Sequence, residues 1–582
     1  MNMVYWNINR QTAESKSDII LYYSLKGGNR MSVLDSFVGY YTAVVRILLP
    51  VIAIWLLVSC CRRLFCGKTD RPPLAMLVGE DGRRYPVLSP ECAVGRGRLC
   101  DVCIPVPTVS RRHAVLTLDR RGWRVSDIRS KGGVFVEGER MTKPVELAFG
   151  HVLQLADVSF RFVHPTKEDI AAHTVTGKTT KSRNLSYIFP LFLLTLFQAF
   201  AGLSLSLHYL SVSALPLSIP LCFLGLIAAE WIYFALRQLR GIGIEILAFF
   251  MVTIGLCVAG SSVPASLFKQ FAAAMLGLAM FWVLSFLLED INRTMKLRYV
   301  IGALAVLLLA VNLLIGESRG GAKNWINFGF ITVQPSEFVK IAFVFAGCAT
   351  LERLMTARNT ILFILFSGAC IGPLFLMRDF GTAAIFFAGM LVISYMRSGD
   401  WKALVFLCAA AAVGSVLIIM LKPYVAGRFA VYRHAWEFAS TTGYQQTRTM
   451  IAIGSGGLFG LGAGKGNLDR VAAADTDLVF GFVSEEWGLL IALCCAACLI
   501  VFALYAVRCA ACARSAYYAS AACATAGMFL FQAALNIFGS TDLLPLTGVT
   551  FPLISNGGSS MAASFAMLAF IQAAGRCEEV TA

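Results

Sequence analysis

The stretch YIFPLFLLTLFQAFAGLSLSLH, residues 187–208, contains no charged residue and is long enough to cross a membrane as a helix. Similar runs recur through the rest of the chain. The whole sequence is 57% hydrophobic and 14% charged, with a mean hydropathy of +0.70, whereas a soluble domain carries about 25% charged residues. The composition therefore predicts a polytopic α-helical membrane protein and excludes an ordinary soluble one.

Apolar runs of helix length predict a membrane core of about 12 transmembrane helices and one further span near the N-terminus. The core is expected at 187–575, and the N-terminal span at 37–60, after a polar extracytoplasmic segment at 1–36. The core spans are expected near 187–208, 214–235, 243–263, 268–288, 298–315, 337–355, 359–377, 380–396, 402–421, 480–507, 516–538 and 548–574.

The distribution of positive charge predicts how the chain is oriented. Lys and Arg number 50 against 34 Asp and Glu, an excess that in a membrane protein first indicates positive cytoplasmic loops, so no nucleic-acid partner is expected. Loops with Arg237 and Arg293 alternate with loops, such as 209–213 and 539–547, that carry neither Lys nor Arg. This pattern predicts a cytoplasmic C-terminus and an outward-facing large loop at 422–479.

Residues 72–165 lose the membrane character, and they are expected to form a cytoplasmic domain joined to the core by a linker at 166–186. Polar and apolar residues alternate in HAVLTL (113–118) and WRVSDI (123–128), on either side of an Asp-Arg-Arg-Gly turn. Alternation around a turn is typical of a β-hairpin, so this domain is predicted to be all-β.

This region resembles a forkhead-associated (FHA) domain in the order and spacing of Gly95-Arg96, Ser110-Arg111-Arg112-His113 and Ser130-Lys131. The resemblance implies a β-sandwich whose loops bind phosphothreonine, with a phosphothreonine protein or a Ser/Thr kinase as partner. The residues implied to surround the phosphate are Arg96, Ser110, Arg111 and Lys131, and His113 is expected to support the loop. Guanidinium and hydroxyl donors suit a phosphate dianion.

The family usually has Asn where this chain has Gly132. The departure leaves a degenerate, purely structural FHA domain as the alternative interpretation of this region.

Polar segments enter the membrane core at three further places. Glu337 and Lys340 lie one helical turn apart at the start of an apolar run, and ionisable residues inside a span are usually functional. The segments at 378–382 and 542–560 are polar or rich in helix breakers. Broken backbone at membrane depth is tolerated only where it is buried in protein or lines a cavity, so a polar cavity open to the outside is expected.

These segments resemble the SEDS family (shape, elongation, division and sporulation), which includes RodA, FtsW and SpoVE-like proteins. The matching pieces are, in order, GAKNWI, QPSEFVK, DFGTA, GYQQT, GSGGLFGLGAGKGN, DTDLVFGFVSEEWG and LPLTGVTFPLISNGGSS. The resemblance implies a peptidoglycan glycosyltransferase in the bacterial cytoplasmic membrane. It would polymerise lipid II into undecaprenyl-pyrophosphate-linked glycan on the outer face during elongation, division or sporulation, usually with a class B penicillin-binding protein.

By this resemblance Asp477 is the predicted catalytic residue. Glycan polymerisation needs a base for the acceptor hydroxyl and cations for the departing pyrophosphate. An Asp with its ordinary pKa of about 3.9 is a weak base, so burial or a divalent cation (Mg²⁺ or Mn²⁺) would have to help. Whether a metal is bound stays open, and no nucleotide is expected on the outer face. The predicted substrate-binding residues are Lys323, Trp325, Glu337, Lys340, Asp379, Arg428, Gln445, Arg448, Lys465, Glu485, Glu486, Ser555 and Ser559.

Two other functions fit parts of the sequence. A lipid II flippase or transporter would also need a charged cavity among many spans, but transporters tend to contain inverted repeats, and none is visible. A catalytically inactive, FHA-regulated cell-division scaffold is the other alternative, against which Asp477 and its motif argue. Relative to the family, the chain has Asn324 in place of Arg, Met377-Arg378 in place of Gln-Pro, and Asn556 in place of Tyr.

Overall fold

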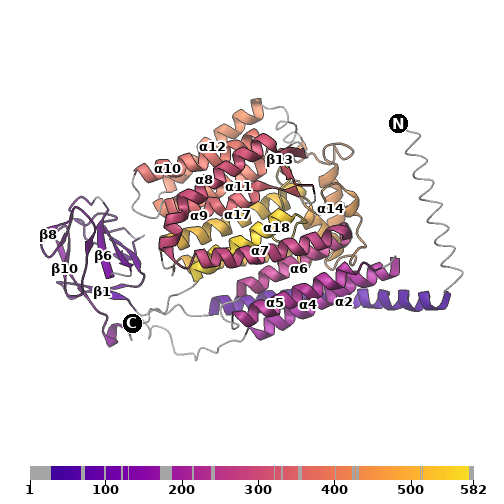
Figure 1. Cartoon of the computed structure of the whole chain (residues 1–582), viewed down its shortest axis with the longest axis horizontal. Coiled ribbons are helices and arrows are strands. Elements are labelled where there is room, and N and C mark those ends of the chain that lie inside the picture. Colours follow the sequence, from indigo (N-terminus) through magenta and orange to yellow (C-terminus); the bar gives the residue numbers. More distant parts are fainter. Residues whose placement is uncertain are drawn as a thin grey trace.

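A computed structural model gives the fold, shown in Figure 1. It describes residues 28–66, 73–97, 100–119, 122–128, 130–170, 187–212, 215–237, 243–319, 322–329, 332–350, 357–399, 401–421, 427, 431–511, 513 and 515–575.

Long apolar helices dominate these residues and confirm the polytopic prediction. Eleven of them are long and apolar enough to cross a membrane. Together with the shorter α9 and with α12, they coincide with the predicted spans. The helices are α2 (Gly28–Cys66), α4 (Ile188–Val212), α5 (Ser218–Leu236), α6 (Gly243–Ser262), α7 (Leu267–Leu287), α8 (Ile291–Ile315), α9 (Pro335–Thr350), α10 (Ala357–Leu376), α11 (Phe380–Ser398), α12 (Trp401–Leu421), α16 (Leu489–Ala510), α17 (Ala516–Ser540) and α18 (Gly558–Gly575).

One predicted span is wrong in its extent. Residues 480–507 form two helices, α15 (Val479–Glu486) and α16 (Leu489–Ala510). Gly488 separates them with a φ of +96°, and a Cβ there would lie 2.4 Å from the carbonyl oxygen of Leu458. Only glycine combines this backbone conformation with so close an approach.

The last span is also shorter than the predicted 548–574. Helix α18 begins only at Gly558, because Pro552 and Gly557 interrupt the backbone before it. These irregular residues are mostly buried, as expected for broken backbone at membrane depth.

The core is built around α6 and α18, whose apolar stretches are 100% and 89% buried inside the protein. Gly277 of α7 lets α18 approach closely, since a Cβ there would lie 2.9 Å from Ala562 Cα. The helices α2, α4 and α5 form a layer along one side of α6 and α7 (Figure 1). Tyr41 of α2 donates to the carbonyl of Phe200 in α4 at 3.0 Å, and Arg508 of α16 donates to the carbonyl of Leu64 in α2 at 2.6 Å.

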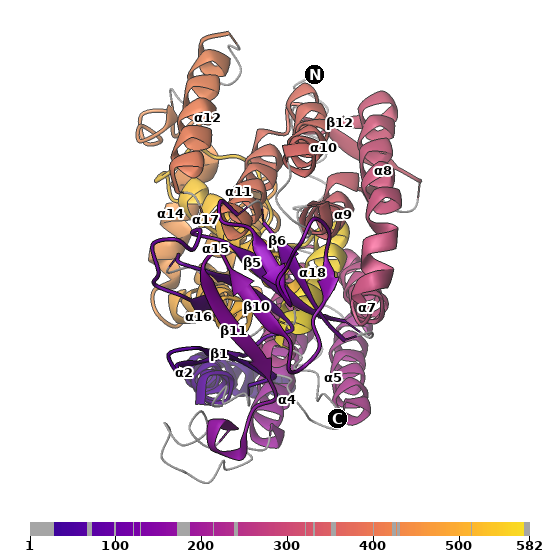
Figure 2. The ribbon, with the colours of Figure 1, turned by 90° about the vertical axis from the view of Figure 1, so that its left-hand side faces the viewer.

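Residues 75–163 form the predicted all-β domain, a sandwich of two sheets (Figure 2). One sheet has the order β2-β1-β11-β10-β7-β8 and the other β4-β3-β5-β6-β9. The predicted hairpin is confirmed by antiparallel pairing of β5 with β6, in which Leu116 faces Val125. The strands are β1 (Ala75–Gly79), β2 (Arg84–Val87), β3 (Glu91–Gly95), β4 (Val102–Cys103), β5 (Ala114–Asp119), β6 (Gly122–Asp127), β7 (Val134–Val136), β8 (Glu139–Arg140), β9 (Val145–Glu146), β10 (Val152–Leu155) and β11 (Val158–Val163).

The β-domain contacts one end of the helical core (Figure 1). Arg112 donates from Nη1 to the carbonyl of Arg397, at the end of α11, at 3.0 Å. Glu91 Oε2 accepts a hydrogen bond from the backbone N–H of Ala516, the first residue of α17, at 3.0 Å. Both contacts lie where the loops are rich in arginine, which is the end of the core predicted to be cytoplasmic.

Candidate functional site

A buried ion pair lies inside the helical core. Glu337 Oε2 and Lys340 Nζ are 2.7 Å apart on the first turns of α9, and the two residues are only 3% and 2% exposed. A charge in such surroundings is costly unless it is paired and hydrogen-bonded. The predicted placement of both residues on one helix face is therefore realised as a direct ion pair.

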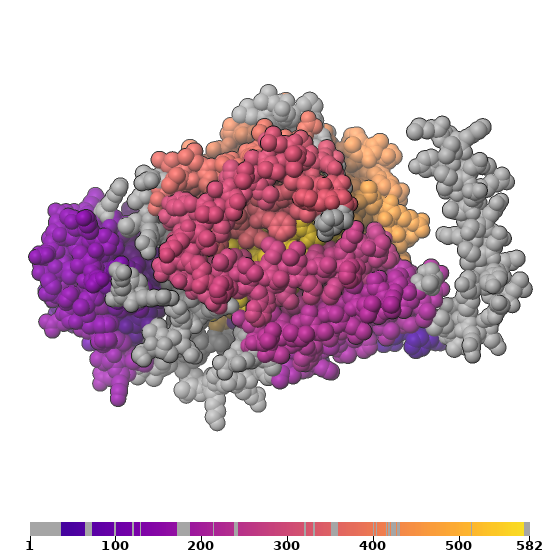
Figure 3. All heavy atoms as spheres, viewed as in Figure 1, coloured from indigo at the N-terminus to yellow at the C-terminus, as the bar shows by residue number. Residues whose placement is uncertain are grey.

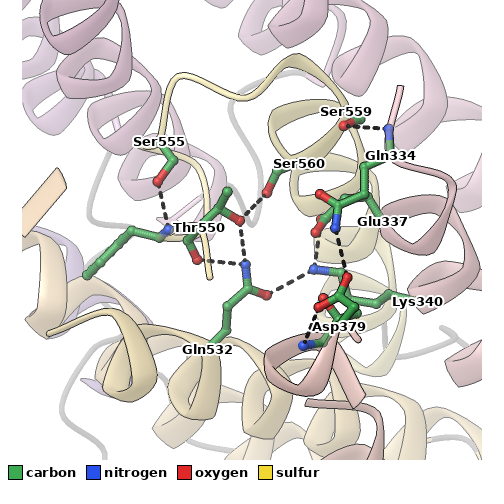
Figure 4. A network of polar contacts seen from close by, with 11 residues as sticks. Gln334, Glu337, Lys340, Asp379, Gln532, Thr550, Ser555, Ser559 and Ser560 are labelled. Carbon is green, nitrogen blue, oxygen red and sulfur yellow. Dashed lines mark hydrogen bonds and ion pairs between the residues drawn. The ribbon is translucent and has the colours of Figure 1, made fainter. Parts of the chain in front are cut away.

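Lys340 is also bound by Gln532 of α17 (Figure 4). Lys340 Nζ donates to Gln532 Oε1 at 3.0 Å. The amide nitrogen of Gln532 donates to the carbonyl and the hydroxyl of Thr550, at 2.8 and 3.0 Å. The Thr550 hydroxyl is in turn 2.8 Å from Ser560 Oγ. The ion pair is thus joined to the irregular segment before α18 and to the first turn of that helix.

Asp379 joins three elements at the end of the core that is predicted to face outward. Its Oδ1 accepts from the N–H of Thr382 at 3.1 Å and caps α11. Its Oδ2 accepts from Asn324 Nδ2 at 2.7 Å and from Gln334 Nε2 at 3.2 Å. Asn324 belongs to the short strand β13 (Ala322–Asn327). The neutral Asn, standing where the family usually has Arg, therefore still bonds to the aspartate.

The segment before α18 forms a cradle for the backbone around Asp477. Ser555 Oγ donates to the carbonyl of Thr476 at 2.6 Å. Asn556 donates from its backbone to the Asp475 carbonyl at 2.9 Å and from its side chain to the Asp475 carboxylate at 2.8 Å. These bonds commit Asp475 and Ser555 to holding the loop.

Asp477 is half-buried, and it lies against a side chain of α17 and against Gly548. Asn536 Nδ2 donates to the Asp477 carbonyl at 2.9 Å and to the Val549 carbonyl at 2.7 Å. A Cβ on Gly548, whose φ is +68°, would lie 3.1 Å from Asp477 Oδ2. Glycine at this position therefore brings backbone up against the carboxylate.

One face of α17 connects the two centres. Gln532 contacts Lys340, and Asn536, one helical turn further out, contacts Asp477. One turn advances a helix by about 5.4 Å. The predicted catalytic aspartate and the buried ion pair are therefore held by neighbouring side chains of a single helix.

Several predicted substrate-binding residues are engaged in structural contacts. Lys323 Nζ donates to the carbonyls of Leu313 and Leu314 at 3.2 Å each, at the C-terminal end of α8, where a cation also suits the helix dipole. The Gln445 side chain donates to the Ala472 carbonyl at 2.9 Å.

Glu485 likewise holds backbone, because its carboxylate accepts from the N–H groups of Asn467 and Leu468, at 3.1 and 2.9 Å. Its neighbour Glu486 is 3% exposed, and burial raises the pKa of Glu486 to about 8.

Ser559, in the first turn of α18, is also engaged, because its Oγ accepts from the Gln334 N–H at 3.4 Å.

The remaining predicted residues are more accessible. Arg448 is exposed and stacks over the Tyr444 ring at 5.1 Å, Lys465 is exposed, and Trp325 is half-buried on β13. Arg428 lies outside the described residues.

The sequence prediction missed Gln532, Asn536, Thr550 and Ser560. A signal for the first two was present, since Gln532 and Asn536 are polar residues four apart inside an apolar run and share one helix face. Thr550 and Ser560 could not be singled out from a segment so rich in Ser, Thr and Gly.

The loops of the β-domain form a second candidate site. Arg96, Arg111 and Lys131 are exposed, and the Lys131 N–H donates to Ser110 Oγ at 3.0 Å. His113 is fully buried and accepts from the Ser110 N–H at 3.0 Å, so it supports the loop as expected.

At Gly132 the departure from the family pattern has a packing reason. A Cβ at that position would lie 2.3 Å from the Cβ of Ala156, so a side chain would need the backbone to shift.

Comparison with known proteins assigns the helical core. The model of the FtsW, RodA and SpoVE family, described as "Cell cycle protein", matches residues 231–579, more than half of the chain. The chain belongs to this family. A model described as "FHA domain" matches residues 92–156, so the β-domain is an FHA domain.

Relatives in the family carry enzyme names. The chain is 31% identical to the "Probable peptidoglycan glycosyltransferase FtsW" of Dichelobacter nodosus, over 52% of this chain and 79% of that protein. It is 27% identical to the "Peptidoglycan glycosyltransferase RodA" of Mycobacterium leprae, over 52% of this chain and 68% of that protein. A solved structure described as "Structural coordination of polymerization and crosslinking by a peptidoglycan synthase complex" contains a chain with 27% identity and a TM-score of 0.50, covering 57% of this chain and 97% of that one.

The residues around Asp477 offer limited support for a bound cation. Within the described ranges, no group of three or more His, Cys, Asp or Glu side chains could hold a metal ion. Mg²⁺ is often held by one or two carboxylates together with substrate phosphates, and Asp477 could supply one such carboxylate. The divalent cation stays a prediction.

Replacing Lys340 by Met should destabilise the family core strongly, because it leaves Glu337 buried without its partner, at a cost of about 3–5 kcal/mol. The double variant Glu337→Gln/Lys340→Met should recover much of this loss, since no buried charge remains. Thermal unfolding of the purified protein in detergent measures both. Lys269→Met, at an exposed position of α7, is the matched control, and equal losses in the single and double variants would contradict the argument.

Replacing Arg96 by Ala should lower the affinity for phosphothreonine peptides at least tenfold, because the exposed guanidinium is a principal phosphate ligand in this prediction. Fluorescence polarisation of labelled phosphothreonine peptides with the full-length protein measures the affinity. Arg83→Ala is the matched control, because it removes one positive charge from the turn between β1 and β2 and leaves the predicted phosphate-binding loops unchanged. Unchanged binding in Arg96→Ala would favour the purely structural FHA domain.

Proposed function

We propose that this protein is a peptidoglycan glycosyltransferase that polymerises lipid II on the outer face of the bacterial cytoplasmic membrane. The observation that carries the proposal is the placement of Asp477. It lies at the outer end of a family core, held by Asn536, Gly548 and the Ser555 segment, one helical turn from the contact with the buried Lys340.

Asp477 would act as the base. The acceptor sugar hydroxyl attacks the anomeric carbon of the donor sugar, the bond from that carbon to the pyrophosphate oxygen breaks, and the electron pair leaves with the pyrophosphate. The hydroxyl proton passes to the Asp477 carboxylate. Positioned acid–base groups contribute about 10²–10⁴-fold to a rate, and the bond from Asn536 to the Asp477 carbonyl supports a fixed position for this residue.

Departing pyrophosphate needs positive charge. Lys340 is bound to Glu337 and Gln532, so it is better suited to fixing the geometry of the site than to meeting the leaving group. Arg448 and Lys465 are exposed on the outer loop, and they are the better candidates for the anion.

The lipid part of the substrate has a route along the side of the core. Figure 3 shows a hollow between the residues coloured red and those coloured magenta, at the bottom of which yellow C-terminal residues are visible. A hollow on the membrane-facing side suits a substrate that carries a long lipid tail.

The FHA domain would regulate the enzyme from the cytoplasm. Arg111, implied in phosphate binding, directly precedes Arg112, which bonds to the end of α11. Helices α11 and α17, which the FHA domain contacts at one end, carry Asp379, Gln532 and Asn536 at the other. A phosphothreonine protein or a Ser/Thr kinase is the proposed ligand, and a class B penicillin-binding protein is the proposed partner on the outer side. The latter rests on the resemblance and on the solved peptidoglycan synthase complex.

Asp477→Asn should reduce lipid II polymerisation by at least about 100-fold, because the amide cannot accept the hydroxyl proton. Glycan products are measured on gels with the purified protein and its partner, using fluorescent lipid II. Asp469→Asn replaces an exposed aspartate of the same loop and should retain activity. Full activity of Asp477→Asn would refute the catalytic assignment, and an inactive wild type that moves lipid II across vesicles would favour the transporter.

A further inference from the structure

The helices α2 and α4 precede the region 231–579 that matches the family, yet they contact its glycine-rich loop segment. A Cβ on Gly462 would lie 2.8 Å from the Thr42 methyl group of α2. A Cβ on Gly464 would lie 2.4 Å from the imidazole of His208 in α4. Both glycines have positive φ values, +109° and +67°. The loop therefore lies flush against side chains of these two helices.

Buried polar side chains lie next to the contact between α2 and the loop. Arg46, one turn after Thr42, lines a cavity together with Gly462, Glu486 and Trp487. Within the part of the chain that the structure describes, one buried atom of each of three of these residues has no hydrogen-bond partner: Arg46 Nε, Glu486 Oε2 and Trp487 Nε1. Buried polar atoms are nearly always paired in a settled core. The boundary between α2 and the loop is thus closely packed, but some of its buried polar atoms lack hydrogen bonds among the described residues.

The contacted loop segment is bonded directly to α15. The N–H groups of Leu461 and Gly462 donate to the carbonyls of Glu485 and Glu486, at 2.8 and 2.9 Å. Those two glutamates end α15, a helix of eight residues that begins at Val479, two positions after Asp477. A shift of the segment against α2 and α4 would therefore move a short rigid helix whose other end is next to Asp477.

We infer that α2 and α4 form a positioning surface for the glycine-rich loop segment and, through it, for Asp477. Thr42 and His208 are its positioning residues. The inference rests on the proposed function, because it assigns these side chains to orienting Asp477. They do not contact the substrate themselves. The FHA domain is inserted between these same two helices, at residues 75–163. The chain therefore links the FHA domain covalently to both helices, and the helices reach the loop through the packing contacts of Thr42 and His208.

His208→Ala tests this inference in the full-length protein with its partner. Removing the ring leaves Gly464 without its support, so kcat for lipid II polymerisation should fall about tenfold to 100-fold, since small misplacements of catalytic groups cost this much. The KM for lipid II should stay within about twofold, because substrate contacts are unchanged. His208→Phe keeps a ring of similar shape and should restore most of kcat.

Leu210→Ala is the matched control, because this residue lies two positions along α4 and is 48% exposed. Hydrogen exchange of residues 458–468 gives a readout independent of activity, and it should accelerate in His208→Ala but not in Leu210→Ala. Unchanged kcat and unchanged exchange in His208→Ala would overturn the inference, as would a raised KM at constant kcat. An inactive wild type would refute the proposed function, while the exchange experiment would still decide whether α4 supports the loop.

Discussion

The buried pair of Glu337 and Lys340 is the constraint on which the arrangement of the core depends. Two opposite charges, both at most 3% exposed inside an apolar bundle, are costly unless they are paired, and Lys340 is hydrogen-bonded as well. Lys340 therefore needs Gln532, and Gln532 in turn fixes Thr550 in the segment before α18. Helix α17, which carries Gln532, also places Asn536 against the backbone of Asp477. The bonds that satisfy the buried ion pair and the bond that holds Asp477 thus come from one face of α17.

Much of the fold follows from the sequence because the membrane makes apolar length a strong signal. Charge-free runs predicted the helices, and alternating residues predicted the hairpin of the FHA domain. The failures occurred where backbone conformation decides the outcome. Gly488 divides one apolar run into two helices, and Pro552 and Gly557 delay the start of the last one. Hydropathy does not register such breaks, since the interrupting residues are themselves apolar or small.

The candidate site was less predictable than the fold. The resemblance to the family identified the segments, but not what each side chain bonds to. Lys323 and Glu485 were predicted to bind substrate. In the structure Lys323 bonds to the last carbonyls of α8, and Glu485 accepts from N–H groups of the loop. Gln532 was overlooked inside an apolar span. Such roles depend on which distant segments meet, and a single sequence does not contain that information.

The pairing of the first and last strands of the FHA domain has a consequence for how the chain is organised. Met76 of β1 pairs with Val163 of β11, so the two ends of the domain emerge side by side. A module with adjacent ends can be placed in a connection between two helices without pulling them apart. The connection between α2 and α4 could therefore acquire a complete recognition module in one genetic step, and exchange it for another, with the membrane architecture preserved.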